Sequence, residues 1–496
     1  MSRQLQTSSR LLFRFPAAFL VVSWMANLVM GASGAVPSAT PDAASPFGYH
    51  PASISSGPHS GGSFSKAHDL GIRWNRGSLY AYWFLVQKNL DSASYDFEEL
   101  DRQFRAVPPD ICILANIAPQ GNVDEGRCKP GSWIPVDVEK YAAFVRETVE
   151  RYDGDGVHDM PGLVNPIHCW QVGNEPDMPQ PGGPTRTDFW ALQRITYEAI
   201  KSADPRATVL LAGIGGGSPE GFLHSFDECY SPLLHKLAGK YVDVVDFHWY
   251  LGLAGDYRLR EAGSGRDVLG HIRSTLKDSG FPDGFPIWAT EMGACSGQPK
   301  AGPPAEFQSE WQQATGYFKM FVYALSHGVG KVFGAWGLME GQMSGGEHFF
   351  DLTGIIYDGK GSHDPGAGTK KLAYYSYKKM TEKLEKVDWA GAIPITEESD
   401  GGATWIFRLQ RNGKPMFVAW QDFTEHSPPD KGAEKPVKID SVAGTSVVVT
   451  EAIPSASSGR EVKSYRGAFR VTRHPVKDGS VVVPLGLNPV YIEVQE

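Results

Sequence analysis

The stretch IHCWQVGNEPD, residues 167–177, begins as a short apolar run and ends in a polar turn. The run is rich in β-branched and aromatic residues and is too brief for a core helix, which favours a strand. Seven further runs of this kind occur, at residues 47–50, 71–76, 111–117, 208–213, 242–250, 286–291 and 332–336. The stretch is therefore the fourth in a series of eight predicted strands.

Amphipathic stretches with apolar residues at helical spacing lie between several of these runs. They cover residues 137–151, 188–203, 267–279, 309–327 and 370–384. Alternating strands and helices predict a parallel sheet, and eight such strands predict a closed (β/α)₈ TIM barrel of the α/β class. A doubly wound sheet fits less well, because the sequence has neither a G-x-G-x-x-G turn nor a Walker loop. The glycine-rich residues 213–217 predict a loop whose backbone passes close to the cleft.

The pattern changes after about residue 387, where short strands follow one another without helices between them. Predicted strands lie at residues 405–409, 415–420, 446–450, 479–485 and 490–494, and Asn412-Gly413 predicts a hairpin turn between the first two. The chain is therefore predicted to hold a barrel over residues 46–386 and a small antiparallel β-sandwich over residues 387–496. The sandwich is expected to brace the barrel, and a sugar-binding role is a second interpretation.

The N-terminus has the features of an export signal. Arg3, Arg10 and Arg14 accompany a mostly apolar stretch at residues 15–30, and the small residues 31–35 offer a cleavage site. The apolar stretch is short and interrupted for a membrane span, so cleavage is favoured over anchoring. We predict a signal peptide over residues 1–35, a flexible leader over residues 36–45, and a secreted or periplasmic protein that has no membrane attachment after cleavage.

Composition and missing motifs exclude several classes of function. The 496 residues carry a net charge of −9, which argues against a protein that binds nucleic acid. The sequence lacks the H-E-x-x-H motif of many metal hydrolases, and it also lacks the G-x-S-x-G motif of a serine nucleophile. The expected chemistry therefore needs no metal and no organic cofactor.

Two glutamates occupy the strand ends at which a barrel places its active site. Glu175 follows the fourth predicted strand, and Glu291 ends the seventh. These strands lie across the barrel mouth from each other, so the two carboxyl groups can face one another. Cleavage of a glycosidic bond needs one carboxyl group to protonate the leaving oxygen and another to attack the anomeric carbon. We therefore predict Glu175 as the acid/base and Glu291 as the nucleophile.

Two residues of the sixth predicted strand are candidates to support these glutamates. His248 and Tyr250 alternate along the strand and therefore point to the same face. Tyr250 is expected to hold or polarise Glu291. His248 is expected to bind a sugar hydroxyl or to lie near Glu175.

Three further residues are expected to bind the substrate or support the nucleophile. Asn174 precedes the predicted acid/base and is expected to bind the sugar hydroxyl beside the anomeric carbon. Arg73, placed at the end of the second strand, is expected to pair with Glu291 and keep it ionised. Trp336 ends the eighth strand and is expected to form the floor of a sugar subsite.

Residues 47–384 resemble glycoside hydrolase clan A, a group of retaining (β/α)₈ enzymes. The resemblance rests on the Asn174-Glu175-Pro176 turn after strand four, Glu291 after strand seven, the His248-Trp249-Tyr250 run and Trp336. The runs TGIIYDG and KKLAYYSYKKM also look like the last loop and helix of many clan members. Family 39 is most similar, with families 5 and 30 as related possibilities.

The resemblance implies a retaining glycosidase that acts on an oligosaccharide or polysaccharide. It implies Glu175 as acid/base, Glu291 as nucleophile, and five binding or supporting residues: Asn174, Arg73, His248, Tyr250 and Trp336. Gly173 departs from the clan pattern, since many members carry a bulky tryptophan there, and this leaves the sugar open. The alternative is a secreted carbohydrate-binding barrel without turnover.

Overall fold

The computed structural model describes residues 44–55, 62–178, 188–218, 220–300, 306–341, 348–362, 364–399, 402–423 and 433–496. The predicted signal peptide (1–35) lies outside the described residues, as does the predicted leader (36–45) except for its last two residues. Within the described ranges, no helix is both long enough and apolar enough to cross a bilayer.

Among the described residues, eight parallel strands form the barrel, in the spatial order β6-β5-β4-β2-β1-β9-β8-β7. They are β1 (Phe47–His50), β2 (Trp74–Arg76), β4 (Cys112–Ala118), β5 (Cys169–Val172), β6 (Thr208–Leu210), β7 (Val245–Tyr250), β8 (Ile287–Gly293) and β9 (Val332–Ala335). The short strand β3 (Ala81–Tyr82) also pairs with β4. Parallel bridges from Leu210 to Val244 and from Ile214 to Phe247 join β6 to β7, so the sheet closes on itself. The predicted barrel is confirmed.

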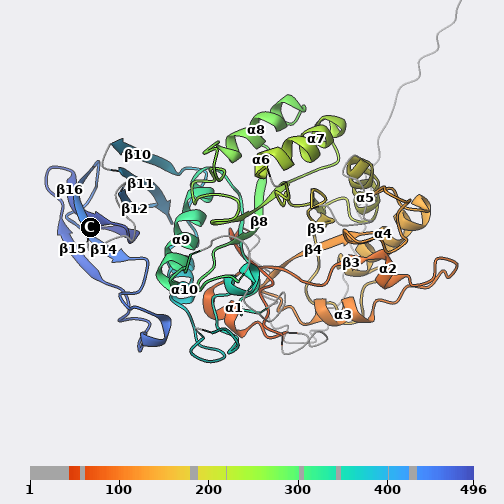
Figure 1. Ribbon diagram of the computed structural model, residues 1–496, viewed down its shortest axis with the longest axis horizontal. Coiled ribbons are helices and arrows are strands. Elements are labelled where there is room, and N and C mark those ends of the chain that lie inside the picture. Colours follow the sequence, from red (N-terminus) through yellow and green to blue (C-terminus); the bar gives the residue numbers. More distant parts are fainter. Residues whose placement is uncertain are drawn as a thin grey trace, which may run out of the picture. The chain divides into compact units, whose positions relative to one another are not determined.

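Helices surround these strands (Figure 1). They are α1 (Ser65–Leu70), α2 (Trp83–Val86), α3 (Glu98–Arg105), α4 (Val138–Tyr152), α5 (Phe189–Ala203), α6 (Phe222–Ser225), α7 (Ser231–Leu237), α8 (Val268–Asp278), α9 (Glu310–Ser326) and α10 (Leu372–Leu384). A π-helical turn, η2 (Phe226–Tyr230), connects α6 to α7. The five helical stretches expected from the sequence correspond to α4, α5, α8, α9 and α10.

Side-chain caps fix where three of these helices begin. Asp137 accepts a hydrogen bond from the Lys140 amide at the start of α4, and Asp267 accepts one from the Gly270 amide at the start of α8. Ser309 and Gln312 form a capping box at the start of α9. Each cap satisfies an amide that the first helical turn would otherwise leave without a partner.

The C-terminal strands form the predicted β-sandwich. One sheet has the order β10-β11-β12-β17-β14-β15, and β13 pairs with β16 in a second sheet. The strands are β10 (Ile393–Ser399), β11 (Gly402–Arg411), β12 (Lys414–Phe423), β13 (Glu434–Asp440), β14 (Ser446–Glu451), β15 (Val471–Pro475), β16 (Ser480–Gly486) and β17 (Val490–Gln495). Phe417, Val483 and Ile492 belong to one buried apolar cluster shared by the two sheets. The exact domain bounds, 46–386 and 387–496, stay a prediction.

The turn at Asn412-Gly413 joins β11 to β12 as predicted. Both residues have positive φ, at 51° and 75°, which matches a type I′ hairpin. The strands β10, β13 and β15 were not expected from the sequence. In β15 the residues alternate between exposed and half-buried, and the strand carries little apolar signal.

Polar contacts attach the sandwich to the barrel helices. Lys319 on α9 is buried and pairs with Asp422 on β12, with 2.7 Å between Nζ and Oδ1. Glu310 on the same helix accepts hydrogen bonds at 2.7 Å from the amides of Leu372 and Gly459. Because a buried charge is costly without its partner, these contacts fix the packing of α9 against the sandwich. They fit the expected bracing role.

Candidate active site

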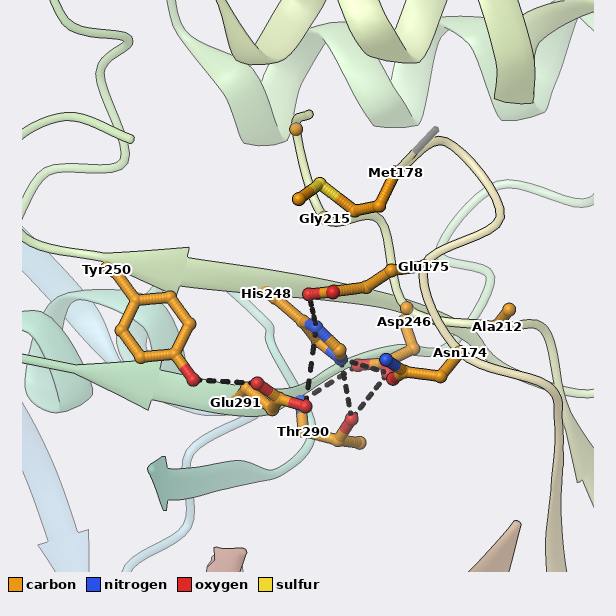
Figure 2. A network of polar contacts seen from close by, with 12 residues as sticks. Asn174, Glu175, Met178, Ala212, Gly215, Asp246, His248, Tyr250, Thr290 and Glu291 are labelled. Atoms are coloured by element: carbon orange, nitrogen blue, oxygen red, sulfur yellow. Dashed lines mark hydrogen bonds and ion pairs between the residues drawn. The ribbon is translucent and has the colours of Figure 1, made fainter. Parts of the chain in front are cut away.

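Glu175 and Glu291 lie opposite each other at the C-terminal ends of the barrel strands (Figure 2). Glu175 follows β5, the fourth barrel strand, and Glu291 belongs to β8, the seventh. One oxygen of each carboxyl group and one ring nitrogen of His248 all lie within 4.8 Å of one another. The Glu291 side chain is 9% exposed and the Glu175 side chain 22%. The structure therefore brings together the two glutamates that the sequence singled out.

Glu291 is held by two short hydrogen bonds. Arg76 Nη1 donates to its Oε1 at 2.6 Å, and the Tyr250 hydroxyl donates to its Oε2 at 2.6 Å. His50 Nε2 lies 3.4 Å from Oε1. Burial raises the pKa of Glu291, but the charges of His248 and Arg76 outweigh burial and lower that pKa to about 2. Glu291 is therefore a carboxylate at neutral pH.

Glu175 has a different environment. His248 Nδ1 lies 2.6 Å from its Oε1. Burial, with the charges of Glu291 and Asp177, raises the pKa of Glu175 although this histidine lowers it. The backbone of Glu175 has a φ of +44°, in the left-handed region that a non-glycine residue adopts at a cost. Asn122 Nδ2 donates to the Glu175 carbonyl oxygen at 3.1 Å and helps to hold this turn. The pKa of Glu175 is therefore raised above its ordinary value, whereas that of Glu291 is lowered.

The glycine-rich loop after β6 packs directly against Glu175 and His248. A β-carbon on Gly213 would overlap His248 Nε2, and one on Gly215 would lie 2.9 Å from Glu175 Cδ. The buried Asp177 carboxylate accepts the amide N–H groups of Gly215 at 3.1 Å and Gly216 at 2.7 Å, which fixes the loop in place. The predicted close approach of this backbone to the cleft is confirmed.

Arg73 does not reach Glu291, so its expected pairing is wrong. It precedes β2, its side chain is 37% exposed, and its Nη1 pairs with Asp110 Oδ2 at 3.0 Å. The strand ends at Arg76, and only the last residues of a parallel barrel strand reach the catalytic face. Arg76, three residues later, therefore takes the position that the prediction gave to Arg73.

The other predicted supporting residues do gather around the two carboxyl groups. His248 contacts Glu175 and Tyr250 contacts Glu291, as described above. Asn174 Oδ1 accepts a hydrogen bond from Arg76 Nη2 at 2.6 Å. Trp336 follows β9, and its ring centre lies 4.3 Å from that of His50.

Solved structures with a similar fold are glycoside hydrolases. A family 39 glycoside hydrolase from Bacteroides cellulosilyticus WH2 has a TM-score of 0.58 at 15% identity, over 87% of this chain and 77% of its own. The α-L-arabinofuranosidase of Thermotoga maritima has a TM-score of 0.55 at 13% identity, over 91% and 95% of the two chains. The GH30 xylanase C of Talaromyces cellulolyticus has a TM-score of 0.53 at 13% identity, over 93% and 99%.

The chain has the fold of these glycoside hydrolases. The sequence itself matches no family model and no curated protein. A family 39 structure is among the neighbours, so the expected resemblance to clan A is confirmed for the fold. The glutamate pair lies on the strands that the resemblance implied.

Three site residues were missed at the sequence level: His50, Arg76 and Tyr80. His50 is the last residue of β1, and its Nδ1 lies 2.7 Å from the Arg76 carbonyl oxygen. Arg76 is fully buried, and its guanidinium carbon lies 5.4 Å from the centre of the Tyr80 ring. His50 and Arg76 end predicted strands, so the rule that located the glutamates would also have located them.

Replacement of Arg76 by methionine is expected to raise the pKa of Glu291, because the carboxylate loses its buried counter-charge. Leaving a buried carboxylate without its partner is also expected to lower the free energy of unfolding by about 3–5 kcal/mol. A lowered pKa stabilises the fold only above the ordinary carboxyl range, so this difference should shrink as the pH falls toward about 2. Carbon NMR of the Glu291 carboxyl group and denaturant unfolding at several pH values measure both effects.

The matched control is Arg73→Met. It removes only the half-exposed pair with Asp110, and exposed pairs contribute about 0–1 kcal/mol. We expect the Glu291 titration to be unchanged in this variant. Equal effects of the two replacements on Glu291 would show that Arg76 does not hold the carboxylate.

Proposed function

We propose that this protein is a retaining glycoside hydrolase with Glu291 as nucleophile and Glu175 as acid/base. The observation that carries the proposal is the pair of opposed carboxyl groups, whose nearest oxygens lie within 4.8 Å and whose pKa values shift in opposite directions. Retaining enzymes hold their carboxyl groups about 5 Å apart, whereas inverting enzymes leave about 6.5–9.5 Å for a water molecule. The separation supports direct attack by a carboxylate.

In the first step the ionised Glu291 attacks the anomeric carbon and the bond to the leaving oxygen breaks. Glu175, protonated because burial favours its neutral form, gives its proton to that oxygen. Arg76 and Tyr250 keep Glu291 oriented and charged until it attacks. A glycosyl ester on Glu291 is the product of this step.

In the second step Glu175 acts as a base. It takes a proton from water while the water oxygen attacks the anomeric carbon and the ester bond to Glu291 breaks. Two inversions leave the configuration of the sugar unchanged. Asn174, which Arg76 holds beside the acid/base, is positioned to bind the hydroxyl next to the anomeric carbon.

The substrate is proposed only as a class, an oligosaccharide or polysaccharide with an O-glycosidic bond. The similar solved structures are described as a glucosidase, arabinofuranosidases and xylanases, so they differ in the sugar they accept. Trp336 beside His50 is the proposed floor of the subsite, since the apolar face of a sugar packs well on an indole. We further propose export from the cytoplasm, on the basis of the N-terminal sequence alone.

The proposal is tested by incubating the purified protein with aryl glycosides and polysaccharides and following the first-formed anomer by proton NMR. We expect one sugar to be released with retained configuration. An inverted product would contradict the nucleophile assignment. Tight binding of a glycan without cleavage would favour the carbohydrate-binding barrel.

Replacement of Gly215 by alanine is expected to lower kcat/KM by about 100-fold, because a shift of about 1 Å at a catalytic group has an effect of this size. The added methyl group would press on Glu175 Cδ and displace the proton donor. Gly467→Ala is the control, since the nearest atom there lies 3.9 Å from the added carbon. Equal rates for the two variants would mean that the loop does not position Glu175.

A further inference from the structure

Asp246 lies buried beside the His248 ring, two residues before His248 on β7 (Figure 2). Its Oδ2 lies 3.4 Å from His248 Nε2. The other ring nitrogen, Nδ1, lies 2.6 Å from Glu175 Oε1. The Asp246 side chain is 0% exposed and that of His248 1%. One imidazole therefore connects a buried carboxylate to the proposed acid/base.

In the described part of the chain, the neighbours of Asp246 donate hydrogen bonds to its carboxyl group. Its Oδ1 accepts the Thr290 amide at 2.8 Å, and its Oδ2 accepts the Thr290 hydroxyl and Gln171 Nε2, each at 2.5 Å. A carboxylate accepts hydrogen bonds at both oxygens and donates none, so this donor set matches the ionised form. A carboxylate at His248 Nε2 in turn favours a proton on that nitrogen.

Further charged groups face His248 from the neighbouring strands. Glu291 Oε1 on β8 lies 3.6 Å from Nδ1 and attracts the protonated ring. Arg76 on β2 pairs with the same Glu291 oxygen and opposes this attraction. His50 on β1 lies 3.4 Å from that oxygen, but burial and the charge of Arg76 lower the pKa of His50. Burial lowers the pKa of His248, but Glu291, Asp246 and Glu175 together outweigh burial and raise that pKa. The imidazole is therefore held as a cation between carboxyl groups.

We propose that Asp246 is a positioning residue that keeps His248 charged and so sets the pH up to which Glu175 holds its proton. This inference rests on the proposed function. In the first step the proton leaves Glu175 for the glycosidic oxygen, and the new carboxylate accepts a hydrogen bond from the His248 Nδ1–H that Asp246 maintains. In the second step a proton from water returns to Glu175. Asp246 and His248 keep their own protonation states throughout.

The test is the pH dependence of kcat/KM for Asp246→Asn, with an aryl glycoside that the wild type cleaves. In Asp246→Asn the ring loses its charge at a lower pH, and the cation that lowers the pKa of Glu175 is then gone. The alkaline limb is therefore expected to move about one to two pH units higher, the size of shift that one close charge produces. A uniform fall in rate with the limb unmoved would reduce Asp246 to a structural role and overturn the proposal.

A second variant guards against misfolding of the first. The side-chain amide introduced by Asp246→Asn would turn its N–H₂ group toward Gln171 Nε2, so two donors would meet. In Asp246→Asn/Gln171→Glu the carboxylate introduced on β5 accepts from that amide and keeps the acceptor that Arg76 Nε and Asn116 Nδ2 use. The net charge is unchanged, but the carboxylate beside His248 Nε2 is gone. The alkaline limb is again expected above that of the wild type, and a wild-type profile would overturn the proposal.

Nitrogen NMR of the His248 ring gives a readout that does not depend on activity. The ring is expected to lose its charge at lower pH in both Asp246 variants than in the wild type. An unchanged titration would overturn the role of Asp246 even if the protein is an active glycosidase. If the wild type cleaves no glycoside but the titration moves as expected, the proposed function fails while the Asp246–His248 coupling stands.

Discussion

Replacement of Glu291 by alanine is expected to lower kcat by about 10⁴-fold or more, as the loss of a catalytic nucleophile does in other enzymes. The side chain is buried, ionised and oriented by Arg76 and Tyr250, so no neighbour can replace it in attacking the anomeric carbon. Glu291→Gln is the matched variant, since it keeps the shape and one acceptor oxygen but removes the charge. Both rates are measured with the substrate that the wild type cleaves best.

Azide separates a lost nucleophile from a damaged fold. In Glu291→Ala a small anion can enter the space left by the carboxylate and attack the anomeric carbon from the same side. The product is then a glycosyl azide of inverted configuration, because only one displacement has occurred. If azide restores nothing and the variant unfolds at the same temperature as the wild type, Glu291 is not the nucleophile.

Replacement of Glu175 by alanine is expected to lower the rate by about 10²–10⁴-fold for substrates whose leaving group needs a proton, the usual contribution of a general acid. Aryl glycosides with acidic phenols leave without help, so their first step should be slowed far less. The alkaline limb of the wild-type pH profile should also disappear, because the group that loses its proton there is gone. Steady-state and burst kinetics over a series of aryl glycosides measure these effects.

The control for this variant is again azide. Water needs a base in the second step but azide does not, so azide should accelerate turnover and give a glycosyl azide of retained configuration. A rate loss that is the same for every leaving group would contradict the assignment of Glu175 as acid/base.

The barrel was predictable because its strands are apolar on both faces and therefore read as short continuous runs. Most of the missed helices are short. Among them α3 has only eight residues and offers two buried apolar side chains, Leu100 and Phe104, too few for a clear helical period. The strand β15 was missed for a similar reason, since it lies at a sheet edge and carries little apolar signal. Local pattern therefore predicts the elements that bury most surface.

The site was predictable where chemistry coincides with a strand end. Glu175, Glu291, His248 and Tyr250 were located in this way. Arg73 failed because it lies before β2, whereas the residue that reaches the barrel mouth is the last one of the strand, Arg76, at which the predicted run also ends.

The role of Asp246 was beyond reach of the sequence. An aspartate inside an apolar strand gives no local sign of a function, because a single polar residue does not form a motif. Its partners come from β5 and β8, on segments roughly 40 to 75 residues away along the chain. Only the closed barrel brings these side chains together, so no local sequence pattern could predict their hydrogen bonds.

The most direct test of the account is to trap the covalent intermediate. A 2-deoxy-2-fluoro aryl glycoside of the sugar that the wild type cleaves should react once and then stall, because the fluorine slows both steps whereas the good leaving group speeds only the first. Mass spectrometry of the whole protein and of its proteolytic peptides locates the sugar. The account predicts one sugar per chain, attached to Glu291. Attachment to Glu175 or to any other residue would contradict it.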